Sequence, residues 1–145
     1  MSYFKFHFER GGFLTTKLRD DAASTVTSVL EIIPVESQVQ HTRWCGREIY
    51  LPIKTLHLPE KENQTCVVSK FDLVYWRDWD FKDQNHAPET LSMFYGAEKL
   101  GFHGGPITVN VIGRVLWEQE KILEAIGERI WSLGFEKVRV ELLPE

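Results

Sequence analysis

The sequence predicts a mainly β protein, a closed or nearly closed β-barrel of seven or eight antiparallel strands with two α-helices, formed as one domain from 145 residues. Apolar residues alternate with polar residues in several short segments, as in strands with one buried face. Two longer segments instead place their apolar residues on one helical stripe. The chain contains no internal repeat and no linker that would divide it. Closure into a barrel would leave no sheet edge exposed.

The N-terminal segment is predicted to form a β-hairpin. Phenylalanine alternates with polar side chains over residues 4–9, and Gly11 and Gly12 follow. These glycines can adopt the positive φ angles that a tight turn requires. Residues 13–19 then return as the second strand, with one face made by Leu14, Thr16 and Leu18.

A helix is predicted next, because the period of the apolar residues changes after residue 21. Asp20 and Asp21 precede the change and are expected to cap the helix, and Pro34 follows its end. Its apolar stripe consists of Ala22, Ala23, Val26, Val29, Leu30 and Ile33.

The middle of the chain returns to strand character. Residues 36–52 predict a hairpin that turns at Cys45–Gly46, and residues 77–89 are expected to form a loop. The other extended segments are residues 66–69, 71–76 and 90–95.

The C-terminal part predicts a strand, a helix and a last strand. Residues 107–115 have strand character through their first half, and residues 118–133 form an amphipathic helix that Gly134 ends. Residues 135–143 alternate again and predict the final strand. The stripe of the helix is Ile122, Leu123, Ile126, Ile130 and Leu133.

Composition excludes several classes of function. The formal net charge is -4 and no dense run of lysine and arginine occurs, so nucleic acid is not an expected partner. No apolar stretch approaches the ~20 residues that cross a membrane, and we expect a cytoplasmic protein. Two cysteines exclude a disulfide scaffold. The five histidines have no metal-ligand spacing, so neither a metal nor a cofactor is expected.

Two stretches resemble cyclophilins. They are TTKLRDDAASTVTSVLEIIP at residues 15–34 and NVIGRVLWEQEKILEAI at residues 110–126. With HTRWCGREIYLP at 41–52 and MFYG at 93–96, nearly the whole chain resembles the cyclophilin-like family DUF3830. The resemblance implies a cyclophilin-like barrel and carries no established activity.

The chain departs from the prolyl isomerases of that fold. Arg43 stands at roughly the place of their arginine, but the pattern Phe-x-x-x-x-Phe-x-x-Gln does not follow it. Trp117 and His103 do not occur in the matching order. Peptidyl-prolyl isomerase activity is therefore the weaker alternative.

The hairpin of residues 40–52 concentrates the polar groups that could carry chemistry. A two-residue turn at Cys45–Gly46 would pair Arg43 with Glu48 and His41 with Tyr50, and would place all four on one face. Arg43 could then clamp an anion, with Glu48 and His41 as acid or base. The alternative is an Arg/Glu pair on a solvated sheet face, which contributes little.

Aromatic residues near the hairpin are candidate ligand contacts. Trp44 lies beside the predicted turn, and Tyr75 and Trp76 end a predicted strand. Trp79 and Phe81, which follow, could wall a pocket or contact a partner protein. The glycine-rich segments supply two further candidates, Tyr95 and His103, and have no nucleotide-binding spacing.

These residues predict a site for a small molecule, an anionic or amide-bearing metabolite, in an enzyme or in a binding subunit. The first alternative is a non-catalytic interaction subunit with an apolar patch around Trp79 and Phe81. A homo-oligomer is compatible with either function.

Overall fold

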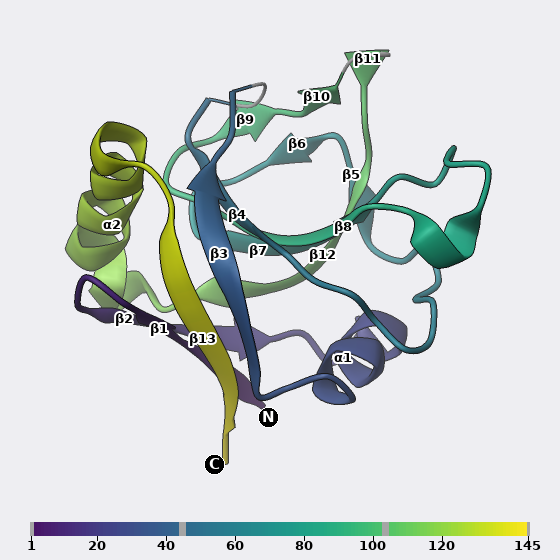
Figure 1. Ribbon diagram of the computed structural model, residues 1–145, viewed down its shortest axis with the longest axis horizontal. Coiled ribbons are helices and arrows are strands. Elements are labelled where there is room, and N and C mark those ends of the chain that lie inside the picture. The colour runs from purple at the N-terminus through teal and green to yellow at the C-terminus, as the bar shows by residue number, and fades with distance from the viewer. Residues whose placement is uncertain (1, 44–45, 103–104, 145) are drawn as a thin grey trace.

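The computed structural model describes residues 2–43, 46–102 and 105–144, which form a barrel (Figure 1). Its long strands are all antiparallel to their neighbours and follow the order β2-β1-β13-β3-β4-β8-β7-β12. Pairing of β12 with β2 closes the barrel. Within the described residues the eight long strands are β1 (Tyr3–Phe8), β2 (Phe13–Leu18), β3 (Val35–His41), β4 (Glu48–Pro52), β7 (Asp72–Arg77), β8 (Glu89–Phe94), β12 (Val109–Val115) and β13 (Glu136–Leu143). The predicted closed barrel is confirmed.

The barrel interior holds the main core, and the predicted alternation of the N-terminal hairpin accounts for part of it. Phe4, Phe6 and Leu14 are fully buried. Gly11 and Gly12 both have positive φ angles at the turn, as expected. Interior side chains from the other strands include Val39, Ile49, Leu51, Leu73, Leu91, Met93, Ile112, Val138 and Val140.

Short strands form an arm on the outer face of the sheet. β6 (Val67–Val68) pairs with β9 (Glu98–Lys99), and β10 (Gly101–Phe102) pairs with β11 (Gly105–Pro106). β5 (Gln64–Thr65) adds to β12. The arm encloses a second apolar cluster, which consists of Val68, Val74, Phe94, Leu100, Val109 and Val111.

The two α-helices lie on opposite sides of the barrel (Figure 1). α1 (Ala23–Leu30) is shorter than its predicted stripe, and the residue at its N-cap is Ala22. The expected capping by Asp20 and Asp21 is wrong, because neither stands at the N-cap and the N-cap residue forms no side-chain hydrogen bond. The Asp21 carboxylate instead accepts two bonds from the Arg19 guanidinium, at 2.8 and 2.7 Å.

α2 (Glu120–Leu133) follows a 3₁₀ turn, η2 (Trp117–Gln119), and ends at Gly134, whose φ is 87°. Leu123, Ile126 and Ile130 are buried, as the stripe predicted. Ile122 and Leu133 are 41% and 64% exposed, so the stripe is narrower than expected. Among the described residues, neither α-helix is long and apolar enough to cross a membrane.

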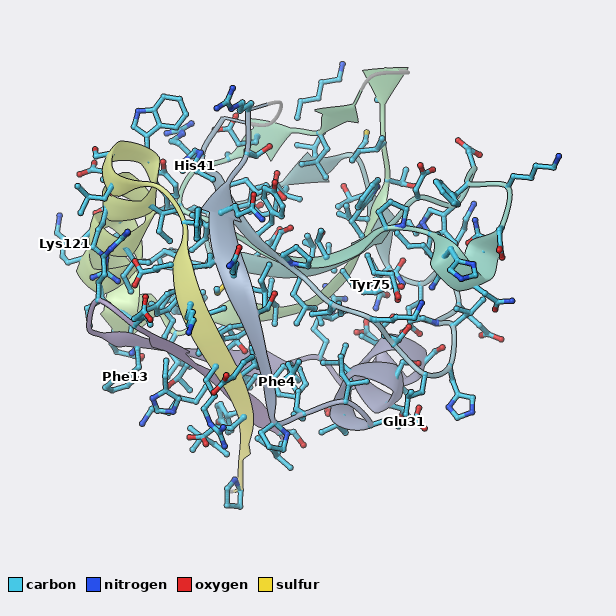
Figure 2. All side chains as sticks on the ribbon, viewed as in Figure 1. Phe4, Phe13, Glu31, His41, Tyr75 and Lys121 are labelled. Carbon is cyan, nitrogen blue, oxygen red and sulfur yellow. The ribbon has the colours of Figure 1, made fainter. Side chains whose placement is uncertain are left out.

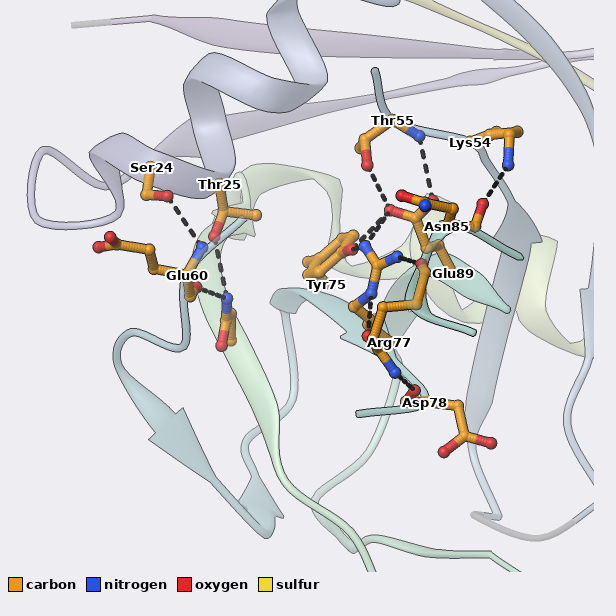
Figure 3. Close-up of polar contacts among 12 residues, drawn as sticks. Ser24, Thr25, Lys54, Thr55, Glu60, Tyr75, Arg77, Asp78, Asn85 and Glu89 are labelled. Atoms are coloured by element: carbon orange, nitrogen blue, oxygen red, sulfur yellow. Dashed lines mark hydrogen bonds and ion pairs between the residues drawn. The ribbon is translucent and has the colours of Figure 1, made fainter. Parts of the chain in front are cut away.

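The segment expected to be a loop contains a buried polar cluster (Figure 3). Arg77 ends β7 and Glu89 begins β8, and their side chains are 1% and 3% exposed. Arg77 Nη1 lies 3.2 Å from Glu89 Oε1, and a 3₁₀ turn, η1 (Gln84–His86), supplies further acceptors for the guanidinium. The prediction of a loop across residues 77–89 is therefore wrong at both ends, because a buried ion pair extends the two strands.

Candidate functional site

A groove of about 810 Å³ lies against the outer face of the barrel at β3, β4 and β8. Ile49 and Leu51 of β4 are buried in the interior, so Tyr50 between them faces outward. Tyr50 pairs with Ser92 of β8, and the next outward row contains Thr90 and Trp76. The floor of the groove is thus a sheet surface with polar side chains and one indole ring.

The observed register of the β3–β4 hairpin differs from the predicted register by one residue. Tyr50 pairs with Gln40 and Ile49 pairs with His41, while Thr42 N donates to Glu48 O at 3.0 Å. The predicted pairing of His41 with Tyr50 is therefore wrong. The connection spans residues 43–47, which is longer than the two-residue turn expected at Cys45–Gly46. Trp44 and Cys45 lie outside the described residues.

Arg43, Glu48 and Tyr50 nevertheless line the same groove. Burial raises the pKa of the Tyr50 hydroxyl, the negative charge of Glu48 raises it further, and the positive charge of Arg43 lowers it. Both charged groups therefore act on Tyr50 across a short distance. Tyr50 also donates a long bond of 3.4 Å to Gln40 Oε1. All four hairpin residues singled out from the sequence line the groove, although His41 stands opposite Ile49 and not opposite Tyr50.

His41 also lines the groove, but it is held by partners on both ring nitrogens. Nδ1 lies 2.8 Å from Thr42 O, and a carbonyl oxygen only accepts, so Nδ1 carries the proton of the neutral ring. Nε2 then accepts from the Tyr95 hydroxyl at 2.6 Å. The His41 ring also meets the Trp131 ring edge to face, with centroids 4.8 Å apart. Figure 2 shows His41 at the end of β3 that faces α2.

Tyr95 lies beneath α2 and is not among the residues that line the groove. A Cβ added at Gly127 would stand 2.5 Å from the Tyr95 ring, so the helix approaches the ring as closely as glycine allows. Burial raises the pKa of the Tyr95 hydroxyl, and the negative charges of Glu128 and Glu98 raise it further. Its hydroxyl therefore stays protonated and donates to His41.

The remaining aromatic candidates occupy different places. Trp76 lines the groove, whereas Tyr75 is fully buried in the barrel interior, where its hydroxyl donates to Glu89 Oε1 at 2.6 Å. Trp79 packs against the main core, and Phe81 is 41% exposed. His103 lies outside the described residues.

Several groove residues were not anticipated from the sequence. Leu100, Ile107 and Val109 form an apolar wall, and Trp131 and Phe135 stand on the side of α2. Trp131 had a recognisable signal, because it is a large aromatic residue outside the apolar stripe of its helix. The wall residues had none, since they belong to strands and connections that meet only in the fold. The described residues contain no group of three or more side chains arranged to hold a metal ion.

Comparison with known proteins identifies the family. A model of the family described as "Protein of unknown function (DUF3830)" matches residues 10–142. The chain belongs to the DUF3830 family. The resemblance of nearly the whole chain to this family is thereby confirmed. No curated protein matches the chain.

Two solved structures are similar in fold. The structure of McbB in complex with tryptophan has a TM-score of 0.70 at 15% identity, over 95% of this chain and 44% of McbB. The chain thus spans less than half the length of McbB. The mimivirus cyclophilin has a TM-score of 0.52 at 14% identity, over 97% of this chain and 85% of that protein. The DUF3830 chain therefore has a cyclophilin-like barrel.

Proposed function

We propose that this DUF3830 protein binds a small organic anion in the groove, with the carboxylate of the ligand on Arg43. The single observation that carries the proposal is the charge pattern of the groove. Arg43 is exposed and lines a space of about 810 Å³, which Lys54 and apolar side chains such as Ile107 also line. A carboxylate in the groove can therefore reach the Arg43 guanidinium. A guanidinium binds a carboxylate through two parallel hydrogen bonds.

Glu48 and Tyr50 complete the anion site in this proposal. Glu48 lines the same groove, and in the proposal it orients the Arg43 guanidinium once the ligand is bound. The Tyr50 hydroxyl, kept protonated by its raised pKa, offers a donor to an amide or carboxylate oxygen. The wall formed by Leu100, Ile107 and Val109 contacts the apolar body of the ligand. Pockets for small molecules combine such an apolar lining with a few polar groups.

Binding is proposed rather than catalysis because of the state of His41. Proton exchange with a ligand at Nε2 would require that nitrogen to leave the Tyr95 hydroxyl, 2.6 Å away. McbB, which has a similar barrel, was solved with tryptophan, a small molecule that has a carboxylate and an apolar ring. That complex supports small-molecule binding as a use of this fold.

Calorimetric titration with a panel of carboxylates and of uncharged cyclic amides tests the proposal. We expect carboxylates to bind and Arg43→Gln to weaken their binding by about 10-fold or more, since a hydrogen bond to a charged group contributes about 1.5–3 kcal/mol. Arg139→Gln is the matched control, because Arg139 lies on β13 and does not line the groove. Equal affinity of Arg43→Gln and the parent protein would refute the assignment of Arg43. Capture of a protein partner without any carboxylate binding would support the interaction-subunit alternative instead.

A further inference from the structure

The α2 side of the groove carries two large aromatic side chains that the rest of the fold does not cover. Trp131 is 65% exposed and Phe135 is 60% exposed, and both line the groove. Phe135 directly precedes Glu136, which pairs with Val39 of β3, so it stands next to the strand that carries His41. Tryptophan is usually buried over most of its surface. Two neighbouring exposed rings at a groove indicate a surface for another apolar group.

The Trp131 ring is held in place from below. The His41 ring contacts it edge to face, at 4.8 Å between centroids and 65° between planes. His41 in turn is fixed by Thr42 O at 2.8 Å and by the Tyr95 hydroxyl at 2.6 Å. Tyr95 has little freedom, because its ring lies against Gly127. An aromatic wall that is already ordered loses little conformational entropy when a ligand stacks on it.

The aromatic wall and the anion site belong to one groove, whose volume of about 810 Å³ can hold one small molecule. Arg43 follows His41, whose ring contacts Trp131, by two residues. The guanidinium and the indole ring are both long side chains that reach the same groove. A carboxylate joined to a ring through one carbon atom is the simplest ligand that offers a group to each of the two side chains.

We propose that Trp131 and Phe135 form an aromatic subsite, and that the ligand of the groove is a carboxylate carrying a planar aromatic ring. His41 and Tyr95 are positioning residues that hold the Trp131 ring. This inference rests on the proposed function and specifies its ligand class. The planar ring stacks on the indole, and the carboxylate binds Arg43.

Titration with phenylacetate and cyclohexylacetate tests the proposal, because the two anions differ mainly in the planarity and π-system of the ring. Aromatic pairs contribute about 0.5–1.5 kcal/mol beyond the area they bury. We therefore expect phenylacetate to bind about 2- to 10-fold more tightly than cyclohexylacetate. Trp131→Leu is expected to abolish this preference. Trp117→Leu is the matched control, since Trp117 is 64% exposed and does not line the groove.

An NMR measurement separates stacking from a general loss of affinity. The protein has five tryptophans, and the indole N–H signal of Trp131 is the one that Trp131→Leu removes. A stacked phenyl ring shifts this signal by its ring current, whereas cyclohexylacetate has no ring current. Tyr95→Phe keeps the ring of residue 95 and removes the hydroxyl bond to His41. It is expected to reduce both the shift and the preference for phenylacetate while Arg43-dependent binding persists.

The outcomes distinguish this proposal from the function on which it rests. Equal, Arg43-dependent binding of the two anions would overturn the aromatic subsite and leave the anion site intact. A preference that survives Trp131→Leu would also overturn the subsite. Failure of both anions to bind, while another carboxylate binds through Arg43, would overturn the aromatic subsite alone, and failure of every carboxylate would overturn both proposals. A ring-current shift of Trp131 together with a preference that Trp131→Leu removes would support both.

Discussion

Replacing Glu89 with alanine is expected to lower the free energy of unfolding by about 3–5 kcal/mol, because it leaves the charge of Arg77 buried without its carboxylate. The Arg77 and Glu89 side chains are only 1% and 3% exposed. Glu89 also accepts hydrogen bonds from the Tyr75 hydroxyl at 2.6 Å and from Thr55 N at 3.1 Å (Figure 3). The substitution therefore removes one acceptor that serves several buried donors.

The size of the effect follows from how little water reaches the pair. A domain of this length is stable by about 5–15 kcal/mol, so the loss would be a large part of the total. A decrease of that size corresponds to a fall in Tm of about 10 °C for a chain near 150 residues. The double replacement Arg77→Met with Glu89→Leu removes both charges. The double variant should lose much less free energy of unfolding than the two single replacements lose together, because neither charge remains buried without its partner.

Urea unfolding of the parent protein, Arg77→Met, Glu89→Leu and the double variant measures this coupling, and Glu89→Ala is measured beside them. Asp21→Ala is the matched control, since the Arg19–Asp21 pair has similar bond lengths but its side chains are 44% and 59% exposed. We expect that control to change stability little. If Glu89→Ala cost no more than Asp21→Ala, or if the single and double replacements were additive, the description of a desolvated ion pair would be wrong.

Three further predictions concern single residues. Gly127→Ala should destabilise the protein, because the new Cβ would stand 2.5 Å from the Tyr95 ring. This contact outweighs the better helix propensity of alanine, so we expect thermal unfolding to show a lower Tm. Burial raises the pKa of Asp72, so the folded state binds its proton more tightly and loses stability as pH rises above the unfolded value of about 3.9. Asp72→Asn should therefore stabilise the protein at pH 7, with a gain that disappears near pH 3; an unchanged difference between the two pH values would contradict this. Burial also raises the pKa of Tyr75, so stability should fall above pH about 10 in the parent protein and less steeply in Tyr75→Phe, as alkaline unfolding curves would show.

Much of the barrel could be predicted because local period and buried face coincide. The alternation around Phe4 and Phe6 and the stripe around Ile126 both follow from one strand or helix with one buried side. The N-terminal cap of α1 could not be predicted from the local pattern. The Asp21 carboxylate could bind either the helix N-terminus or the Arg19 guanidinium, and it binds Arg19. Local patterns thus predict that a helix or strand forms more reliably than they predict which groups form hydrogen bonds with its ends.

The candidate site was harder to predict, because it depends on register and on distant segments. A hairpin with its turn at Cys45–Gly46 places His41 beside Tyr50, whereas the longer connection places His41 beside Ile49. The observed register keeps Ile49 and Leu51 of β4 in the barrel interior. Trp131 meets His41 only because α2 packs against β3, a contact between segments about 90 residues apart in the chain. Pairing rules for neighbouring strands do not predict contacts between a helix and a distant strand.

A crystal structure of the protein with phenylacetate tests the central claim most directly. We expect the carboxylate within about 2.7–2.9 Å of the guanidinium nitrogens of Arg43, with the ring against Trp131. A carboxylate bound at another cation, or directed to solvent while Arg43 stays unoccupied, would contradict it.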